Sequence, residues 1–243
     1  MNTTAKADML AKLQKEILEL QGLHPPLHPQ CQKNELGVMN AAFPNQSFPM
    51  TAVHEFISNS YETAASTYGF MIALLYVLMP EGNYLWVSSQ SVIFPPALTA
   101  FGVIPDNFIF AQVADHKKKM WVMEEALKCE SLSAVIGDLS ELSFTESRRL
   151  QLAVEKSHVT GFIHRHSSQP LHNVACVSRW RISPMESITP NGMPGVGLPQ
   201  WKVELLKIRN GKPATWNIKW TGTGLEPISH TNQENNISFK KTG

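Results

Sequence analysis

The sequence predicts an α/β protein built on a mainly parallel sheet with helices on both faces. Short apolar stretches alternate with longer segments of helical pattern between residues 36 and 182. Parallel strands that are buried on both faces are typically continuous apolar runs of this kind. Further along the chain, Asn210-Gly211 separates two apolar stretches and predicts an antiparallel hairpin of strands 201–209 and 215–220.

The first predicted element is an N-terminal helix over residues 5–21. Its apolar side chains are spaced by three, four and three residues: Leu10, Leu13, Ile17 and Leu20. This spacing places them on one helical face, which could pack on the chain's own core or on a neighbouring subunit. The helical unit 1–22 ends at Gly22, and the run HPPLHP within residues 23–35 predicts a stiff linker.

The first half of the core is predicted to begin with a short strand over 51–56 (TAVHEF). A buried helix over 62–79 and an apolar strand over 84–89 (YLWVSS) follow. Residues 95–101 are expected to form a short helix, because proline is tolerated in a first turn, where its missing N–H costs little.

The second half of the core continues the alternation. Strands are expected over 108–113, 133–139, 160–165 and 175–182, and helices over 115–130 and 145–157. Thr145 is expected to cap the last helix, and prolines and glycines predict a loop over 184–200. The predicted core domain therefore spans 36–224. Residues 225–243 are polar and lack an apolar period, which predicts a disordered tail.

Composition and charge exclude several classes of protein. The 243 residues carry 21 Lys and Arg against 20 Asp and Glu, so nucleic-acid contact would need a local basic patch. Three cysteines without a CxxC pair exclude a disulfide scaffold, and Cys129 and Cys176 are interpreted as buried apolar residues. The longest apolar stretch, 64–79, is interrupted by polar residues and shorter than the roughly 20 residues of a membrane span. A reduced, cytoplasmic protein without membrane contact is expected.

Several segments resemble a known family. The order of strand, loop and buried helix places residues 58–65 where a phosphate-binding P-loop would lie, and GVIPDNFIFAQ at 102–112 is similar to a stretch of the RecA-like ATPase core. Within that superfamily, segments across 5–220 resemble the ImuA-type error-prone repair proteins: KADMLAKLQKEILELQGL, AVHEF, FPPALTAFG, WVMEEALKCE, ELSFTESRRLQLAVE, RWRI and WKVELLKIRNGKP. The resemblance implies a RecA-like core.

The same resemblance implies a non-catalytic accessory protein of DNA-damage-induced translesion synthesis, which acts by protein–protein interaction in a mutasome. The implied partners are an ImuB-like inactive Y-family polymerase homologue, an error-prone C-family polymerase and RecA, with weak DNA contact as a further expectation. No cofactor is implied. Two alternatives stay open: an unconventional DNA-binding ATPase, and a cell-division inhibitor similar to the SulA group.

A working P-loop needs glycines that let backbone N–H groups approach phosphate, a lysine for the charge, and a Ser or Thr hydroxyl for Mg²⁺. In the family alignment, Ser58 and Thr63 stand at the glycine positions, Ala64 at the lysine and Ala65 at the hydroxyl position. Gln90 falls near the position of the catalytic glutamate and cannot act as a carboxylate base. The resemblance therefore implies a degenerate nucleotide site without hydrolysis.

Three residues of the sequence keep an ATPase alternative open. Asp138, after the strand SAVIG, matches the metal-associated Walker B aspartate, although an aspartate at a strand end also commonly caps a turn. Lys207 and Arg209 in KIRNG resemble an element of hexameric RecA-like helicases that reaches a neighbour's γ-phosphate. In this alternative they would act in trans with Asp138. Otherwise they form a solvated strand end or a basic partner surface.

Basic residues gather around the predicted hairpin. The loops that would hold DNA in RecA-type proteins, 140–145 and 167–173, contain no Lys or Arg. A partner or DNA surface is predicted instead from Arg179, Arg181, Lys202, Lys207, Arg209, Lys212 and Lys219. The tryptophans among them (Trp201, Trp216 and Trp220) fit either core packing or a stacking platform for single strands. Arg148 and Arg149 mark either a solvated helix face or a further partner surface.

Metal and nucleophile chemistry is not predicted. His164 and His166 share one strand face, but the spacing predicts no third metal ligand near them. No Ser-His-Asp or Cys-His arrangement can be assigned from spacing alone.

Overall fold

The computed structural model describes Met9, Leu13 and residues 36–91, 93–166, 172–187, 189 and 197–228. The predicted linker 23–35 and all but two residues of the predicted N-terminal helix lie outside the described residues. Met9 and Leu13 are helical, and both side chains are exposed. Within the described ranges, no helix combines the length and the apolar character that crossing a bilayer requires.

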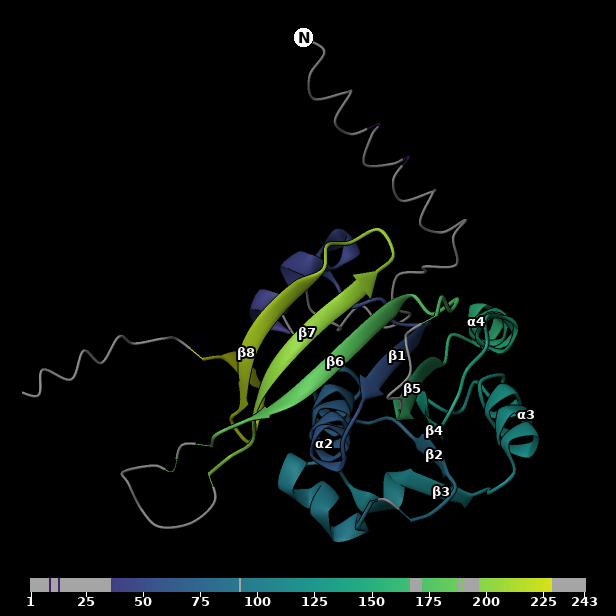
Figure 1. The fold of residues 1–243 in the computed structure, drawn as a ribbon, viewed down its shortest axis with the longest axis horizontal. Helices are drawn as coiled ribbons and strands as arrows, with labels where there is room; N and C mark the ends of the chain where they lie inside the picture. The colour runs from purple at the N-terminus through teal and green to yellow at the C-terminus, as the bar shows by residue number, and fades with distance from the viewer. Residues whose placement is uncertain are drawn as a thin grey trace, which may run out of the picture.

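A nine-stranded sheet forms the centre of the structure, in the order β3-β2-β4-β5-β1-β6-β7-β8-β9 (Figure 1). The strands are β1 Val53–Ser58, β2 Tyr84–Ser88, β3 Phe108–Gln112, β4 Ala134–Leu139, β5 Thr160–His166, β6 Ser178–Met185, β7 Gln200–Ile208, β8 Ala214–Trp220 and β9 Leu225–Pro227. All pairs from β3 to β6 are parallel, and all pairs from β6 to β9 are antiparallel. The predicted fold class, a mainly parallel α/β sheet with a C-terminal hairpin, is confirmed.

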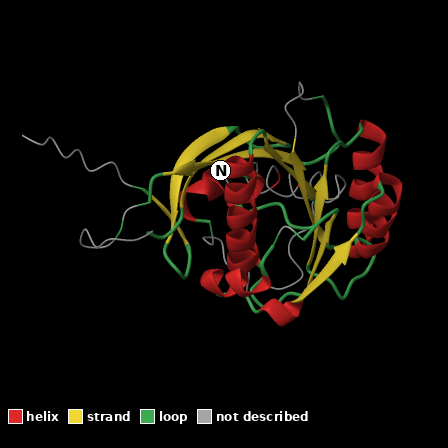
Figure 2. Ribbon diagram, turned by 60° about the horizontal axis from the view of Figure 1, so that its bottom comes forward, coloured by secondary structure: helices red, strands yellow, loops and turns green. Residues whose placement is uncertain are grey.

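Helices cover both faces of the parallel part of the sheet (Figure 2). The α-helices are α2 Tyr61–Leu78, α3 His116–Ala126 and α4 Phe144–Ser157, and the 3-10 helices are η1 Gly37–Ala42, η2 Pro44–Gln46, η3 Pro95–Phe101 and η4 Pro105–Asn107. One core cluster packs α2 against Phe56, Phe162 and Trp180. A second cluster packs α3 and α4 against the opposite face, around Val135 and Ile163. The sheet is therefore doubly wound.

The ends of two helices differ from the prediction. Ser143, and not Thr145, caps α4: its hydroxyl accepts from the backbone N–H of Glu146 at 3.2 Å, and the Glu146 carboxylate accepts from the Ser143 N–H at 2.8 Å. This capping box satisfies two backbone donors. Helix α3 ends at Ala126, so Cys129 lies beyond it and is exposed, contrary to the prediction. Cys176 is buried, which raises the pKa of its thiol to about 12.

The antiparallel part of the sheet extends further than predicted. β6 continues through Pro184 to Met185. Its pairing with β1 ends at Arg181, so Pro184 lies where β6 pairs with β7 alone, and proline is tolerated at such an edge. The predicted tail was wrong at its start, since Leu225 is buried and pairs with Trp220. Residues 229–243 lie outside the described residues.

A buried charge cluster connects three central strands. Glu55 on β1 is fully buried and forms ion pairs with Arg165 on β5, at 2.8 Å, and with Arg179 on β6. Arg179 also donates from Nη2 to the carbonyl oxygen of His172 at 2.7 Å. One carboxylate thus compensates two guanidinium groups inside the sheet.

Candidate functional site

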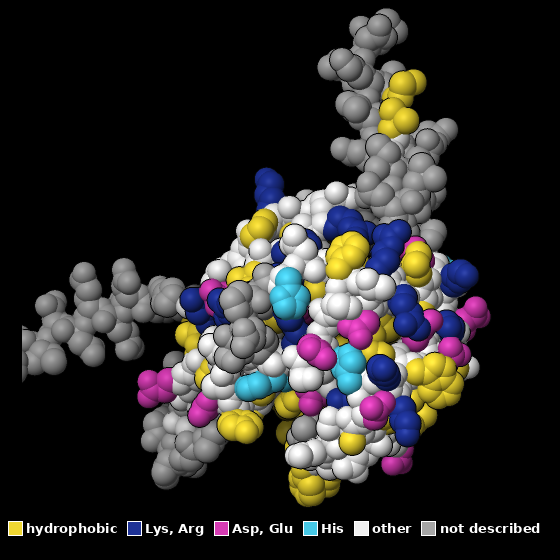
Figure 3. All heavy atoms as spheres, turned by 45° about the vertical axis from the view of Figure 1, so that its right-hand side comes forward, with side chains coloured by type: hydrophobic (Ala, Val, Ile, Leu, Met, Phe, Trp, Pro, Cys, Tyr) yellow, Lys and Arg dark blue, Asp and Glu magenta, His cyan; other side chains and the backbone are white. Residues whose placement is uncertain are grey.

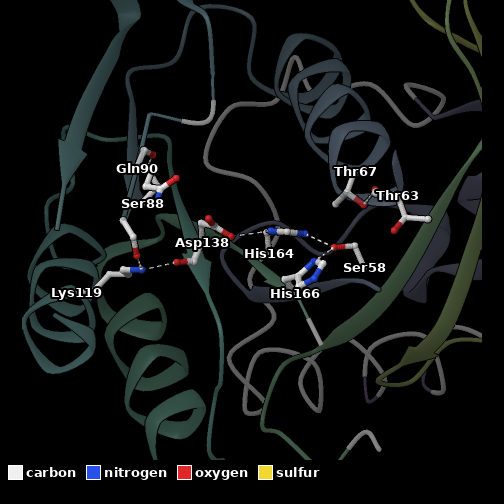
Figure 4. Close-up of polar contacts among 10 residues, drawn as sticks. Ser58, Thr63, Thr67, Ser88, Gln90, Lys119, Asp138, His164 and His166 are labelled. Atoms are coloured by element: carbon white, nitrogen blue, oxygen red, sulfur yellow. Dashed lines mark hydrogen bonds and ion pairs between the residues drawn. The ribbon is translucent and has the colours of Figure 1, made fainter. Parts of the chain in front are cut away.

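The carboxyl ends of three adjacent strands bring together Asp138 of β4, His164 of β5 and Ser58 of β1 (Figure 4). Asp138 Oδ1 lies 2.8 Å from His164 Nδ1, and His164 Nε2 lies 2.7 Å from Ser58 Oγ. We refer to these three residues as the polar row. In a doubly wound sheet, ligands bind outside the carboxyl ends of the strands, where the connections diverge to opposite faces. Here β1 leads to α2 on one face and β4 leads to α4 on the other, so the polar row occupies that position.

Hydrogen bonding connects the three side chains of the polar row. The Asp138 carboxylate accepts from His164 Nδ1, and His164 Nε2 shares the second hydrogen bond with the Ser58 hydroxyl. Tyr68 on α2 packs its ring edge against the imidazole, with centroids 4.7 Å apart. Burial, and then the charge of Asp138, raise the pKa of Tyr68, so its hydroxyl stays protonated. His164 and Ser58 are 1% and 4% exposed, whereas the Asp138 side chain is 21% exposed. Tyr68 of α2 therefore covers the row at His164, and the Asp138 end stays partly exposed.

Lys119 on α3 approaches the same strand ends from the other face. Its ammonium group donates to Ser89 Oγ at 2.7 Å and to the main-chain carbonyl oxygen of Asp138 at 2.8 Å. Burial lowers the pKa of Lys119, while the Asp138 charge acts in the opposite direction. In the sequence it is one of three consecutive lysines, and nothing in that run distinguishes it from its exposed neighbours.

The connection between β1 and α2 uses its own polar groups internally. The connection consists of Asn59 and Ser60. Their N–H groups both donate to the hydroxyl oxygen of Thr63, at 3.3 Å and 3.1 Å. The Thr63 N–H in turn donates to Ser60 Oγ at 3.3 Å. A phosphate at a helix N-terminus is held by such N–H groups, and those of Asn59, Ser60 and Thr63 are already used within this segment.

Alanines stand at two further positions of the predicted nucleotide site, so neither a lysine nor a hydroxyl is present there. Ala64 is buried against the core and Ala65 is exposed. Glu62 lies in the first turn of α2, and the hydroxyl of Ser60 lowers the pKa of its carboxyl group, so it remains negative at neutral pH and repels phosphate. Gln90 lies across Asp138 from Ser58, where its carbonyl oxygen accepts from Ser88 Oγ at 2.5 Å (Figure 4).

The polar row has the connectivity of a hydrolytic Ser-His-Asp triad, which spacing in the sequence could not reveal. Acyl transfer also needs free N–H donors beside the nucleophile to hold the oxyanion. Here the N–H groups of Asn59 and Ser60, next to Ser58, already donate to Thr63, and Ser58 itself is buried. The geometry therefore supports a structural hydrogen-bonded row and not an accessible nucleophile.

The two histidines predicted to share a face do so. Ser58 Oγ lies 2.7 Å from His164 Nε2 and 3.5 Å from His166 Nδ1, and His166 stacks on Tyr61. In the part of the chain that the structure describes, no three His, Cys, Asp or Glu side chains are grouped to hold a metal ion.

The predicted basic surface divides into separate parts. Arg179 is removed from it, because its side chain is buried on Glu55. Lys202 and Lys219 form ion pairs with Glu204 and Glu226. Lys207 and Arg209 donate to the main-chain carbonyl oxygens of Val174 and Ala175, both at 3.4 Å, and Arg181 and Lys212 are exposed.

The tryptophans of the hairpin do not form a base-stacking platform. Trp201 and Trp220 are buried in the core and Trp216 packs against it, so core packing was the correct alternative. Of the predicted DNA loops, residues 140–143 connect β4 to α4, and 167–171 lie outside the described residues.

The fold and the site define a doubly wound α/β protein with a row of hydrogen-bonded side chains at the strand ends where such folds bind ligands. The chain is similar to Protein ImuA of Caulobacter vibrioides, in the strain NA1000 / CB15N and in the strain ATCC 19089 / CIP 103742 / CB 15. Each is 29% identical over 202 residues, which cover 78% of this chain and 83% of the relative. No protein-family model matches the chain. The predicted likeness to ImuA-type proteins is confirmed, whereas the RecA-like superfamily and the roles of the site residues stay predictions.

Proposed function

We propose that this chain is a non-catalytic accessory protein of DNA-damage-induced mutagenesis, and that it works as an adaptor in translesion synthesis. The ImuA likeness supports the process. The connection between β1 and α2 supports the non-catalytic part, because its two N–H groups donate to Thr63, the Thr63 N–H donates to Ser60, and the first turn of α2 carries the negative charge of Glu62. This connection is the observation that carries the proposal.

The polar row explains how the proposed adaptor keeps its shape without a nucleotide. In a nucleotide-dependent protein of this architecture, ligand binding helps to hold the strand ends and the first helix together. Here Asp138, His164 and Ser58 link three strand ends directly, and Tyr68 connects them to α2. Partner surfaces would thus remain in place at all nucleotide concentrations. The partners proposed are an ImuB-like polymerase homologue, a C-family polymerase and RecA.

A nucleotide titration tests this proposal. Fluorescent ATP and ADP with Mg²⁺ are titrated against the full chain, followed by anisotropy, with a RecA-type ATPase as the positive control. We expect no saturable binding. Saturable, Mg²⁺-dependent binding that is lost in Asp138→Asn would overturn the non-catalytic proposal. In a parallel pull-down with purified RecA and ImuB-like protein, recovery should be the same with and without ATP.

The trans-acting ATPase is less well supported, because Asp138 accepts from His164 and both Lys207 and Arg209 donate to carbonyl oxygens of their own chain. The SulA-like alternative stays a prediction. It requires overexpression to cause filamentation in cells that lack the mutagenic polymerase.

A further inference from the structure

Helix α4 carries a ridge of four exposed side chains at four-residue intervals: Phe144, Arg148, Leu152 and Lys156. Phe144 is 58% exposed and Leu152 44% exposed. Side chains four residues apart are neighbours along a helix surface, and such i±4 rows are the ridges that pack into the grooves of other helices. Apolar and basic groups therefore alternate along this ridge, which we call the α4 ridge.

Within the described residues, the charges on the α4 ridge differ from their neighbours in their ion pairs. Arg149, beside the ridge, pairs with Glu124 of α3 at 2.5 Å, and Lys128 pairs with Glu124 and Glu125. In contrast, neither Arg148 nor Lys156 forms an ion pair with any residue in the described ranges. Figure 3 views the side of the molecule on which α3 and α4 lie, where basic, acidic and apolar side chains are interspersed.

The fold does not require these side chains. The opposite face of α4 supplies the packing, through Leu150, Ala153 and Val154. Single exposed apolar residues are common on protein surfaces and need no explanation. The α4 ridge, however, carries two exposed apolar side chains, and each lies one helical turn from a cation without an ion pair in the described residues. This pattern complements a surface of alternating apolar and acidic groups.

We propose that the α4 ridge docks an acidic amphipathic helix of a partner protein. Its carboxylates would meet Arg148 and Lys156, and its apolar side chains would pack on Phe144 and Leu152, as helices do when a ridge of one fills a groove of the other. The chain's own N-terminal segment does not have this chemistry, since residues 1–22 contain three lysines and three acidic residues. Charge complementarity therefore favours a different chain as the occupant.

The inference gives the proposed adaptor one interaction surface, and its test is independent of the nucleotide site. The probe is a fluorescein-labelled helical peptide of about 20 residues with Leu and Glu alternating at four-residue intervals. Control peptides are a scrambled sequence and a version with Lys in place of Glu. Anisotropy with the full chain should show saturable binding of the acidic peptide alone, weakened in about 0.5 M salt, where charges are screened.

Matched variants locate the binding. Arg148→Glu and Lys156→Glu should each lower the affinity for the acidic peptide about tenfold, because each replaces an attractive charge pair at the interface by a repulsive one. Lys118→Glu is the control, because it reverses an exposed charge close to α4 but outside the α4 ridge. Lys118 lies on α3, two residues from His116, which pairs with Glu146 of α4. Lys118→Glu should leave affinity unchanged. Leu152→Ser should also weaken binding, with circular dichroism confirming the fold.

Amide chemical shifts of the labelled protein provide the second readout. Addition of the acidic peptide should shift signals of residues 144–157 and of neighbouring α3. The proposal is overturned if the acidic peptide does not bind, if the scrambled peptide binds equally well, if Lys118→Glu weakens binding as much as Arg148→Glu, or if the shifts map to another surface. None of these outcomes bears on nucleotide binding, so failure here leaves the non-catalytic proposal standing.

Discussion

Replacing Glu55 by glutamine removes the only carboxylate in contact with two buried guanidinium groups in the described part of the sheet. Glu55 is fully buried, Arg165 is 2% exposed, and Arg179 keeps only a small exposed fraction. The amide of Glu55→Gln preserves the shape of the side chain but leaves both arginines uncompensated. This variant therefore isolates the electrostatic part of the cluster.

The expected loss of stability is large. Breaking a buried ion pair by removing one partner typically costs about 3–5 kcal/mol, because the remaining charge stays desolvated. Exposed ion pairs contribute about 0–1 kcal/mol. For a domain of this size, 1 kcal/mol shifts Tm by roughly 2–4 °C, so Glu55→Gln should lower Tm by roughly 6–20 °C.

Equilibrium urea unfolding, followed by circular dichroism and tryptophan fluorescence, measures this loss. The matched control is Glu226→Gln, which breaks an exposed pair with Lys219 on the same sheet, 3.2 Å apart. Glu55→Asp, which keeps the charge, should lose less stability than Glu55→Gln. If the free energy of unfolding of Glu55→Gln lies within about 1 kcal/mol of that of the parent protein, the buried charge cluster does not stabilise this sheet and the prediction is wrong.

Three further predictions concern the pH dependence and two local conformations. His54 is fully buried, with Nε2 donating to the Pro49 carbonyl oxygen and Nδ1 accepting from Ser178; burial lowers its pKa to about 3, below that of the unfolded chain. The contribution of neutral His54 to the free energy of unfolding is therefore complete above about pH 6.5. It is lost as the pH falls towards about 3, by at most about 1.4 kcal/mol per pH unit. The urea midpoint should therefore fall more steeply with acid in the parent protein than in His54→Gln. Ser143→Ala should cost about 1 kcal/mol in urea unfolding by removing the α4 cap, whereas Ser143→Thr should cost less, and equal losses would argue against the capping box. Gly102 has a φ of +74° and a Cβ there would lie 2.6 Å from the Tyr76 ring, so Gly102→Ala should lower the free energy of unfolding by roughly 1–3 kcal/mol; no change would contradict the strain.

The fold was predictable because the apolar runs of the parallel strands carry local information. The Asn210-Gly211 signal for a hairpin between β7 and β8 was equally readable, although Asn210 has a positive φ, of 58°, and Gly211 does not. Helix ends were less certain, because Ser143 and Thr145 are both acceptable caps and only the reach of Glu146 decides between them.

The candidate site was predictable only in part. Asp138 was identified from its place at the end of an apolar strand, but its partner His164 is 26 residues away and was considered only together with His166, a pair for which no third metal ligand was predicted. Which strands become neighbours is decided by the crossover connections, and the sequence does not state that β5 lies between β4 and β1. Lys119 could not be distinguished from two adjacent lysines, because its burial depends on how α3 rotates onto the sheet.

The two-residue connection between β1 and α2 bears on how such a protein could change over evolutionary time. A substitution such as Ala64→Lys would restore a cation, but the backbone between Ser58 and Tyr61 would still be too short to encircle a phosphate. A phosphate site here would require an insertion together with loss of the Thr63 hydroxyl that occupies the loop donors. On the proposed function, single substitutions in this loop are therefore not expected to produce nucleotide binding.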